Sequence, residues 1–262
     1  MKILTTDLDR TFIFSARTIG TSLETARCIE RRDGKPISYI SLKTEQLMQD
    51  VVANGIDIIP VTTRSLSQYR RIDLFQQQVP RYAVACNGGF VLRDGVVDEK
   101  WQEIVAKNVA TCLSFDAFRE RFVACWDMEM FERIDGVDDL FYVLLVDEQK
   151  KDIDTLKALH EQFQAADWTT YLHGRKFYAL PKTLSKEAAV KYVLEKLQPT
   201  VHYAAGDSFM DLGMMQLTEH HFSPQHGEIY EKLGAAAPIC VLEARGATFT
   251  EMMLEEMLLN VP

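Results

Sequence analysis

Two carboxylates separated by one residue follow the first apolar segment of the chain, in the run Asp7-Leu8-Asp9-Arg10-Thr11. Acidic groups this close repel each other and need a compensating cation. A hard divalent ion such as Mg²⁺, which prefers oxygen ligands and keeps several waters, meets that need. The run therefore indicates a metal site or, as the alternative, an Asp-rich turn with solvated acids.

A second acidic pair follows a later apolar segment, in the run Gly206-Asp207-Ser208-Phe209-Met210-Asp211. Asp207 and Asp211 are four residues apart, so both can face the side of the first acidic pair. A purely structural alternative exists, because Ser208 followed by Asp211 resembles a capping box at a helix N-terminus. That alternative explains Ser208 and Asp211 but not Asp207, which precedes the helix.

Hydroxyl groups and a lysine complete the set of candidates. The run Val61-Thr62-Thr63-Arg64-Ser65 follows the second apolar strand, where hydroxyls and backbone N–H groups form a phosphate cradle, although Thr and Ser are also ordinary N-caps. Lys186 stands in the first turn of a predicted helix, where its charge opposes the helix dipole unless an anion lies nearby. The alternative for Lys186 is a solvated surface lysine, as Lys43 near another helix start illustrates.

Short apolar strands precede three of these runs and must position them. The alternation of these strands with helices is typical of a doubly wound α/β core, in which ligands bind beyond the carboxyl ends of the strands. A turn signal at 31–36 predicts a β-hairpin over 26–40. The predicted strands are 2–6, 56–61, 82–86, 201–205 and 239–242, and the predicted helices are 44–54, 66–77, 186–197 and 209–217.

The pattern changes in the middle of the chain, where aromatic residues are more frequent. We therefore expect a core formed by residues 1–88 and 183–262 and an inserted domain at 89–182. Within the insertion the sequence predicts a long helix at 101–124, a strand at 140–146, a helix at 153–165, one or two strands over 168–180, and acidic turns at Asp135-Gly136 and Asp138-Asp139.

The composition is that of a globular protein of 262 residues, of which 47% are hydrophobic and 26% charged, with a net charge of −9. An acidic surface argues against nucleic acid as a partner, because phosphate contacts need a basic face, but it leaves room for a local basic pocket. No segment has the apolar length of a membrane span, and Asp7 stands where a signal peptide would have its apolar run. We therefore expect a cytoplasmic protein without a membrane partner. The five scattered cysteines form no CxxC pair and fit reduced thiols.

Taken in order along the chain, the three runs and Lys186 resemble the four motifs of the haloacid dehalogenase-like (HAD) hydrolases. The resemblance is greatest to the capped branch with Cof-type and sucrose-phosphate-phosphatase-like proteins. The resemblance implies a Rossmann-like, doubly wound parallel sheet with an inserted α+β cap of the C2 type. Asn87-Gly88-Gly89 is similar to the Asn-Gly segment that leads into such caps. The chain departs from the family at Arg10, Thr63 and Met210, where Gly, Gly and Asn are frequent.

The resemblance implies an enzyme, namely a Mg²⁺-dependent hydrolase of the phosphate monoester of a small metabolite, with a sugar phosphate as the leading candidate. Asp7 would attack phosphorus and form an aspartyl-phosphate. Asp9 would protonate the leaving group and then activate water. Because members such as ion-pumping ATPases lack the second acid, Asp9 favours a hydrolase or a mutase.

The resemblance also assigns binding residues. Thr62, Thr63 and Lys186 would bind the phosphoryl oxygens. Mg²⁺ would be held by Asp7, Asp9 through its backbone carbonyl, and Asp207, with Asp211 as a ligand or an orienting group. The candidate substrate contacts are Arg64, Asn87 and Gly88 in the core, and His173, Arg175 and Lys176 in the cap. For the three cap residues, which we expect on the last strand of the cap, the alternative is a solvated basic edge that discourages pairing with another strand.

Two other functions stay open on the sequence. One is a phosphomutase of the phosphomannomutase type, and the other is a non-catalytic regulatory protein that keeps the fold. The complete set of acids argues against the second. The identity of the phosphorylated metabolite stays open. The apolar run at 252–261 fits a core helix or a small interface, and we expect a monomer or a weak dimer.

Overall fold

The computed structural model describes residues 1–126 and 128–259, and the chain divides into two compact units. The first unit combines Met1–Asp98 with the chain from Lys186 onward, and the second unit is Glu99–Ser185. The units therefore change at 98/99 and 185/186, whereas the domain boundaries expected from the sequence are 88/89 and 182/183. Within the described residues, no helix is both long enough and apolar enough to cross a bilayer.

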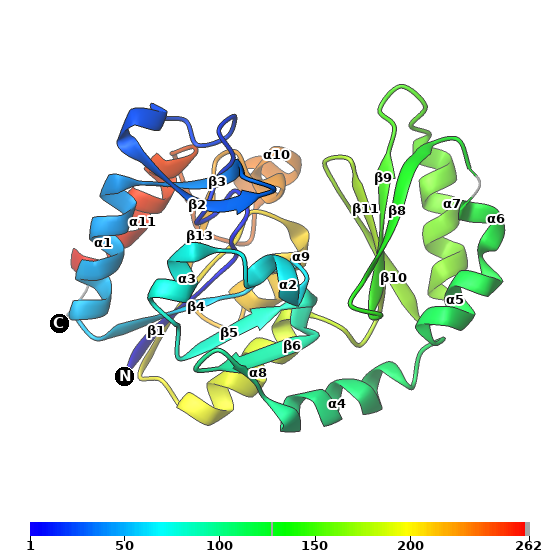
Figure 1. Ribbon diagram of the computed structural model, residues 1–262, viewed down its shortest axis with the longest axis horizontal. Coiled ribbons are helices and arrows are strands. Elements are labelled where there is room, and N and C mark those ends of the chain that lie inside the picture. The colour runs from blue at the N-terminus through cyan, green and yellow to red at the C-terminus, as the bar shows by residue number, and fades with distance from the viewer. Residues whose placement is uncertain (127, 260–262) are drawn as a thin grey trace. The chain divides into compact units, whose positions relative to one another are not determined.

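A five-stranded parallel sheet forms the centre of the first unit (Figure 1). Its strand order is β14-β13-β12-β1-β4, so that β1 is hydrogen-bonded to β12 on one side and to β4 on the other. The expected doubly wound α/β core is confirmed. The strands are β1 (Lys2–Thr6), β4 (Ile56–Pro60), β12 (Val201–Ala205), β13 (His220–Pro224) and β14 (Val241–Leu242).

Two pairs of helices cover this sheet. α1 (Leu42–Ala53) packs against α11 (Ala247–Leu259), and α8 (Lys186–Leu197) packs against α9 (Phe209–Met215) (Figure 1). The C-terminal run is thus a core helix as far as residue 259, because Phe249, Met253 and Leu254 belong to the buried core. Residues 260 and 261 of that run lie outside the described part of the chain. A further short helix is α10 (Glu228–Leu233).

The predicted hairpin is confirmed as β2 (Ala26–Arg32) paired antiparallel with β3 (Lys35–Ser41). Its turn uses the left-handed conformations of Asp33 and Gly34, with φ of 53° and 75°. The predicted single helix at 66–77 is wrong, because it is two short helices, α2 (Leu66–Tyr69) and α3 (Asp73–Gln77). The helix is interrupted at Ile72, which has an extended backbone and forms a β-bridge with Glu30 of the hairpin.

The strand predicted at 82–86 is found as β5 (Tyr82–Ala85), but it belongs to a separate antiparallel sheet. Its partners are β6 (Phe90–Arg93) and β7 (Val96–Val97), which the sequence analysis missed. A single parallel bridge between Val61 and Val84 links β5 to the end of β4. This bridge fixes the loop that follows β4.

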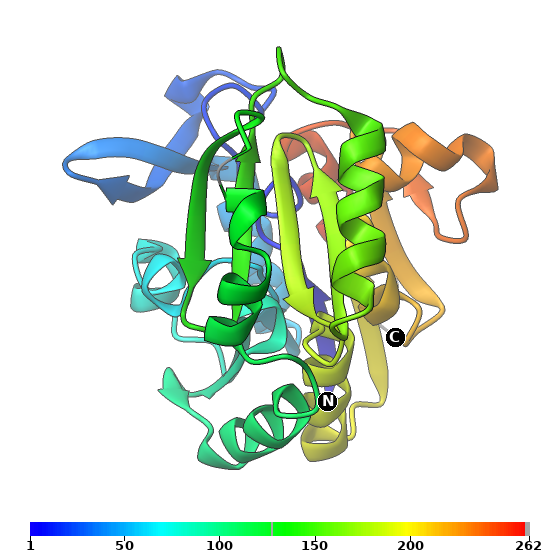
Figure 2. The same cartoon turned by 90° about the vertical axis from the view of Figure 1, so that its right-hand side faces the viewer.

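The second unit contains a four-stranded antiparallel sheet of order β10-β11-β9-β8. Figure 2 faces this unit and shows α7, drawn in light green, lying along the sheet. The strands are β8 (Phe131–Val137), β9 (Phe141–Val146), β10 (Trp168–His173) and β11 (Lys176–Pro181), and the helices are α4 (Glu99–Val109), α5 (Phe115–Arg121), α6 (Val123–Trp126) and α7 (Ile153–Gln164).

Two predictions for this unit are wrong. The long helix at 101–124 is divided among α4, α5 and α6, because the hydroxyl of Ser114 caps a new helix by accepting a hydrogen bond from the amide of Ala117. Asp135-Gly136 is not a turn but part of β8. Gly136 belongs there because the ring of Phe115 leaves no room for a side chain: a Cβ would lie 2.8 Å from that ring. Asp138 and Asp139 do form the turn between β8 and β9, both with positive φ.

Candidate active site

Asp7 meets the second acidic pair at the carboxyl ends of β1 and β12. These strands are paired in parallel with Thr6 beside Ala205, and the amide of Asp7 donates to the carbonyl of Ala205 over 2.9 Å. Carboxylate oxygens of Asp7, Asp207 and Asp211 lie within 4.8 Å of one another, and all three residues are buried. Asp7 is therefore not a solvated acid, whereas the side chain of Asp9 is exposed and does not belong to this cluster.

Lys186 lies among these acids. Its Nζ is 2.6 Å from Oδ1 of Asp7 and 2.6 Å from Oδ1 of Asp211, and the residue is 1% exposed. Burial by itself disfavours the charged form, but the two carboxylates outweigh it and raise the pKa of the Lys186 ammonium. The alternative of a solvated surface lysine is wrong, since the unfavourable position at the start of α8 is offset by two anions.

The pKa of the Asp7 carboxyl is raised, because the group is buried and has two further acids near it but only one lysine. Burial is the main cause that raises the pKa of Asp7 to about 7, with Asp211 and Asp9 adding to the shift and Lys186 opposing it. A second cation would favour the ionised carboxylate. Three buried carboxylates that each offer an oxygen form the type of donor set that a hard ion such as Mg²⁺ prefers, so that the residues present fit this ion.

Asp211 has both of its oxygens engaged, Oδ1 by Lys186 and Oδ2 within the loop that opens α9. Its Oδ2 accepts hydrogen bonds from the amide of Ser208 over 2.9 Å, from the Ser208 hydroxyl over 2.7 Å and from the amide of Asp207 over 3.2 Å. The capping box considered from the sequence is therefore present together with the contact to Lys186. Gly206 allows this arrangement, because a Cβ there would lie 2.3 Å from Cβ of Asp211.

Arg10 occupies a left-handed conformation, with φ of 68°. Its guanidinium donates to the carbonyl of His226 over 2.6 Å, and its Nε lies 3.6 Å from Oδ2 of Asp207. The ring of His226 donates in return to the carbonyl of Arg10 over 2.7 Å. From the sequence, Arg10 stands out only as a departure from the family pattern, and His226 was not predicted because no local pattern connects it to residue 10.

The loop after β4 carries the hydroxyl candidates. Thr62 is 1% exposed, and its amide donates to the carbonyl of Val84 over 2.9 Å. The Thr62 hydroxyl accepts from the amide of Arg64, and its carbonyl accepts from the amide of Asn87. Asn87 is buried and left-handed, with φ of 55°. Thr62 and the Asn87-Gly88 turn are thus held together, while Thr63 beside them is half-buried.

Arg64 binds Asp9 through two parallel hydrogen bonds. Nε donates to one carboxylate oxygen of Asp9 and Nη2 to the other, each over 2.7 Å. Nη1 donates to Glu30, a fully buried residue of the hairpin that the sequence analysis missed. Arg64, a candidate substrate contact from the sequence, therefore contacts Asp9 and Glu30.

The candidate substrate residues of the second unit do not share one strand. His173 ends β10 and Lys176 begins β11, and these two residues are paired across the turn that contains Gly174 and Arg175. Nε of Arg175 donates to the carbonyl of Val146, and its Nη2 forms an ion pair with Glu132. Arg175 thus binds within its own sheet.

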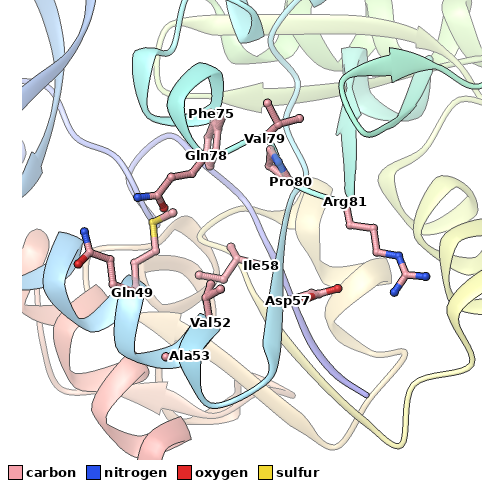
Figure 3. Close-up of a pocket in the computed structure, with 11 residues that line it drawn as sticks. Gln49, Val52, Ala53, Asp57, Ile58, Phe75, Gln78, Val79, Pro80 and Arg81 are labelled. Atoms are coloured by element: carbon pink, nitrogen blue, oxygen red, sulfur yellow. The ribbon is translucent and has the colours of Figure 1, made fainter.

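A cavity of about 450 Å³ lies elsewhere in the first unit (Figure 3). Its walls include Val52 of α1, Phe75 of α3, and Asp57 and Ile58 near the amino end of β4. None of the candidate site residues lines it, because those that follow β4 stand at the opposite, carboxyl end of the strand.

Comparisons with known proteins identify the fold. No family model matches the chain, and no curated protein matches it. The structure is similar to that of a sucrose-phosphatase from Synechocystis sp., in complex with sucrose and phosphate, with a TM-score of 0.68 and 15% identity over 100% of this chain and 98% of the other.

Two further solved structures have similar folds. A HAD/COF-like hydrolase from Plasmodium vivax gives a TM-score of 0.65 at 15% identity over 98% of this chain and 95% of the other. A trehalose-6-phosphate phosphatase related protein gives 0.57 at 15% identity over 99% of each chain. The fold is thus that of the HAD-like hydrolases, as the sequence resemblance implied.

Proposed function

We propose that this chain, which has the fold of the HAD-like hydrolases, is a Mg²⁺-dependent phosphatase that hydrolyses phosphate monoesters of small metabolites. One observation carries the proposal: Lys186 is buried between Asp7 and Asp211, and Asp207 lies within reach of both acids. A cluster of buried charges costs stability, and such clusters are typical of active sites.

Asp7 is the nucleophile in this proposal. One of its oxygens attacks phosphorus as the bond to the leaving oxygen breaks, which divides one difficult displacement into two easier ones. Asp9 gives a proton to the leaving alkoxide. In the second step Asp9 takes a proton from water, which attacks phosphorus and restores the free carboxylate of Asp7. General acid–base help of this kind contributes about 10²–10⁴-fold.

Lys186 and the hydroxyl of Thr62 bind the phosphoryl oxygens, with Thr63 beside them, and stabilise the charge that spreads over these oxygens in the transition state. The Mg²⁺ ion would be held by Asp7, Asp207 and the backbone carbonyl of Asp9. When bound, it neutralises phosphoryl charge. Because both oxygens of Asp211 are engaged, we assign Asp211 the task of orienting Lys186 and the loop after β12.

A sugar phosphate is the substrate class that we favour, since the structures that share the fold include proteins described as a sucrose-phosphatase and as a trehalose-6-phosphate phosphatase related protein. His173, Arg175 and Lys176 stay predictions as substrate contacts. The five cysteines are scattered and form no CxxC pair, which supports a reducing, cytoplasmic environment.

The test is release of inorganic phosphate from a panel of phosphorylated metabolites, with Mg²⁺ and with a chelator. We expect Mg²⁺-dependent release from one or more sugar phosphates by the wild type and none by Asp7→Asn. Movement of phosphate between two hydroxyls of one sugar, without release, would support the mutase instead. Magnesium binding without turnover of any substrate would contradict both enzymatic functions.

A further inference from the structure

A chain of charged groups leads from the hairpin β2–β3 to Asp9. Glu30 of the hairpin binds the guanidinium of Arg64 over 2.5 Å, and Arg64 binds Asp9 through two hydrogen bonds of 2.7 Å. All three residues belong to the first unit. The hairpin thereby reaches the proposed acid through a single side chain.

Glu30 faces inward because the hairpin is irregular at this residue. The register of β2 against β3 shifts on both sides of Glu30, and the residue is 0% exposed. Its Oε2 accepts from the hydroxyl of Ser38 over 2.7 Å, and its Oε1 accepts from Arg71 over 3.1 Å. Two cations and a hydroxyl thus compensate the buried carboxylate.

The buried ion pair between Glu30 and Arg64 is a poor way to gain stability. Apolar side chains of similar volume stabilise a protein as well or better, because buried charges lose their hydration. The arrangement does restrict geometry, since a planar guanidinium that binds a carboxylate with two parallel bonds fixes its orientation. The side chain of Asp9 is 54% exposed, so that packing does not hold it in place, whereas that of Arg64 is 13% exposed.

We propose that Glu30 is a positioning residue for Asp9 and acts through Arg64. The inference rests on the proposed phosphatase function, in which Asp9 protonates the leaving group. Glu30 and Ser38 hold one edge of the Arg64 guanidinium, and the other edge fixes the orientation of the Asp9 carboxylate. The hairpin therefore determines how well the enzyme expels poor leaving groups.

Leaving groups of different basicity separate this role from a structural one. An alkyl phosphate needs a proton on the departing oxygen, whereas an aryl phosphate such as nitrophenyl phosphate leaves readily without one. In Glu30→Gln we expect kcat/KM to fall by about 10–100-fold for the alkyl phosphate, as for other positioning groups, and much less for the aryl phosphate. kcat/KM is the quantity to compare, because it reports only the steps up to loss of the leaving group.

Arg71→Met is the matched control. It removes the second cation of Glu30 but leaves the bonds from Glu30 to Arg64 and from Arg64 to Asp9. Both substrates should then change by the same small factor. Asp9→Asn provides a second check, since Glu30→Gln added to Asp9→Asn should have no further effect on the alkyl phosphate.

An equal fall for both substrates in Glu30→Gln, with unchanged thermal unfolding, would overturn the inference, as would no change for either. The same holds for fully additive effects of Glu30→Gln and Asp9→Asn. A wild type that releases no phosphate from either substrate in Mg²⁺ marks a different failure, that of the proposed function itself.

Discussion

Nζ of Lys186 lies 2.6 Å from Oδ1 of Asp7, although the two residues are 179 positions apart in the chain. The strand β1 ends one residue before the acid, and the helix α8 begins at the lysine. Neither residue has a favourable environment by itself, because each is buried. The pair therefore depends on both elements being in place, and it links the stability of the fold to the chemistry of the site.

Replacement of Lys186 by methionine should destabilise the protein more than the same substitution at any surface lysine. Lys186→Met leaves Asp7 and Asp211 buried without their cation, and we expect a loss of about 3–5 kcal/mol in the free energy of unfolding. Urea denaturation in the absence of metal measures it. Lys43→Met is the control, because Lys43 is exposed and pairs with Glu255 at the surface, where about 1 kcal/mol or less is expected. Equal losses in both variants would contradict the prediction.

Asp7→Asn should abolish turnover and leave the fold intact. An amide does not attack phosphorus as a carboxylate does, and the substitution removes one of the buried acids around Lys186. Phosphate release and circular dichroism are the two measurements. Substantial Mg²⁺-dependent turnover by this variant would refute the assignment of the nucleophile.

Asp207→Asn and Asp211→Asn should differ in their effect on metal binding. Asp207 is assigned as a ligand, so its loss should weaken Mg²⁺ affinity by at least tenfold, whereas Asp211 orients Lys186 and its loss should lower kcat more than affinity. Calorimetric titration with Mg²⁺ gives affinity without any substrate. The assignment of Asp211 fails when its variant loses as much affinity as the Asp207 variant.

Arg10 should weaken divalent binding, because its guanidinium lies 3.6 Å from Oδ2 of Asp207. Arg10→Met removes the charge but keeps a side chain at a left-handed φ, and Arg10→Gly also removes the backbone strain, which is about 1 kcal/mol. We expect both variants to bind Mg²⁺ more tightly in calorimetry, and only the glycine variant to gain thermal stability. An unchanged Mg²⁺ affinity in both variants would show that Arg10 does not act on the ion.

His202 should make the protein less stable in mild acid. Burial lowers the pKa of His202 to about 4, from 6.5 in an exposed histidine. Between these values the unfolded chain binds the proton and the folded chain does not, so that stability is complete above pH 6.5 and falls as the pH decreases towards 4.

The loss from this residue amounts to about 3 kcal/mol at most, since each pKa unit corresponds to about 1.4 kcal/mol. Unfolding by urea at pH 7.5 and pH 5 should therefore show a smaller pH difference in His202→Gln than in the wild type. Burial also lowers the pKa of His226, so that both proteins keep part of the dependence of stability on pH. If stability depended equally on pH in the two proteins, His202 would not be a cause of the loss in acid.

Strands and helices with a clear local sequence pattern were predicted accurately. The bounds of β12 and α8 were predicted to the residue, because the apolar run stops at Gly206 and the helical pattern stops at Gln198. The strand β13 was missed, since it begins with His220 and His221. The division of the long helix at Ser114 was missed because an N-cap within a helical pattern is easily overlooked.

The candidate site divides in the same way. The order of the motifs predicted that Asp7, Asp207 and Lys186 lie together, because the carboxyl ends of parallel strands meet at one edge of the sheet. Glu30 could not be predicted from the order of the motifs. Its partners Arg64 and Arg71 lie 34 and 41 residues away, and only the irregular hairpin turns its side chain inward.

The strand order of the parallel sheet determines when the nucleophile loop can form during protein synthesis. β1 lies between β4 and β12, so that one edge of the strand that carries Asp7 stays unpaired until residue 205 has left the ribosome. At ordinary rates of translation this takes about 10–40 s, long enough for the inserted unit to fold first. A nascent chain stalled before β12 should therefore contain a folded insertion and an open, aggregation-prone strand edge in place of an active site.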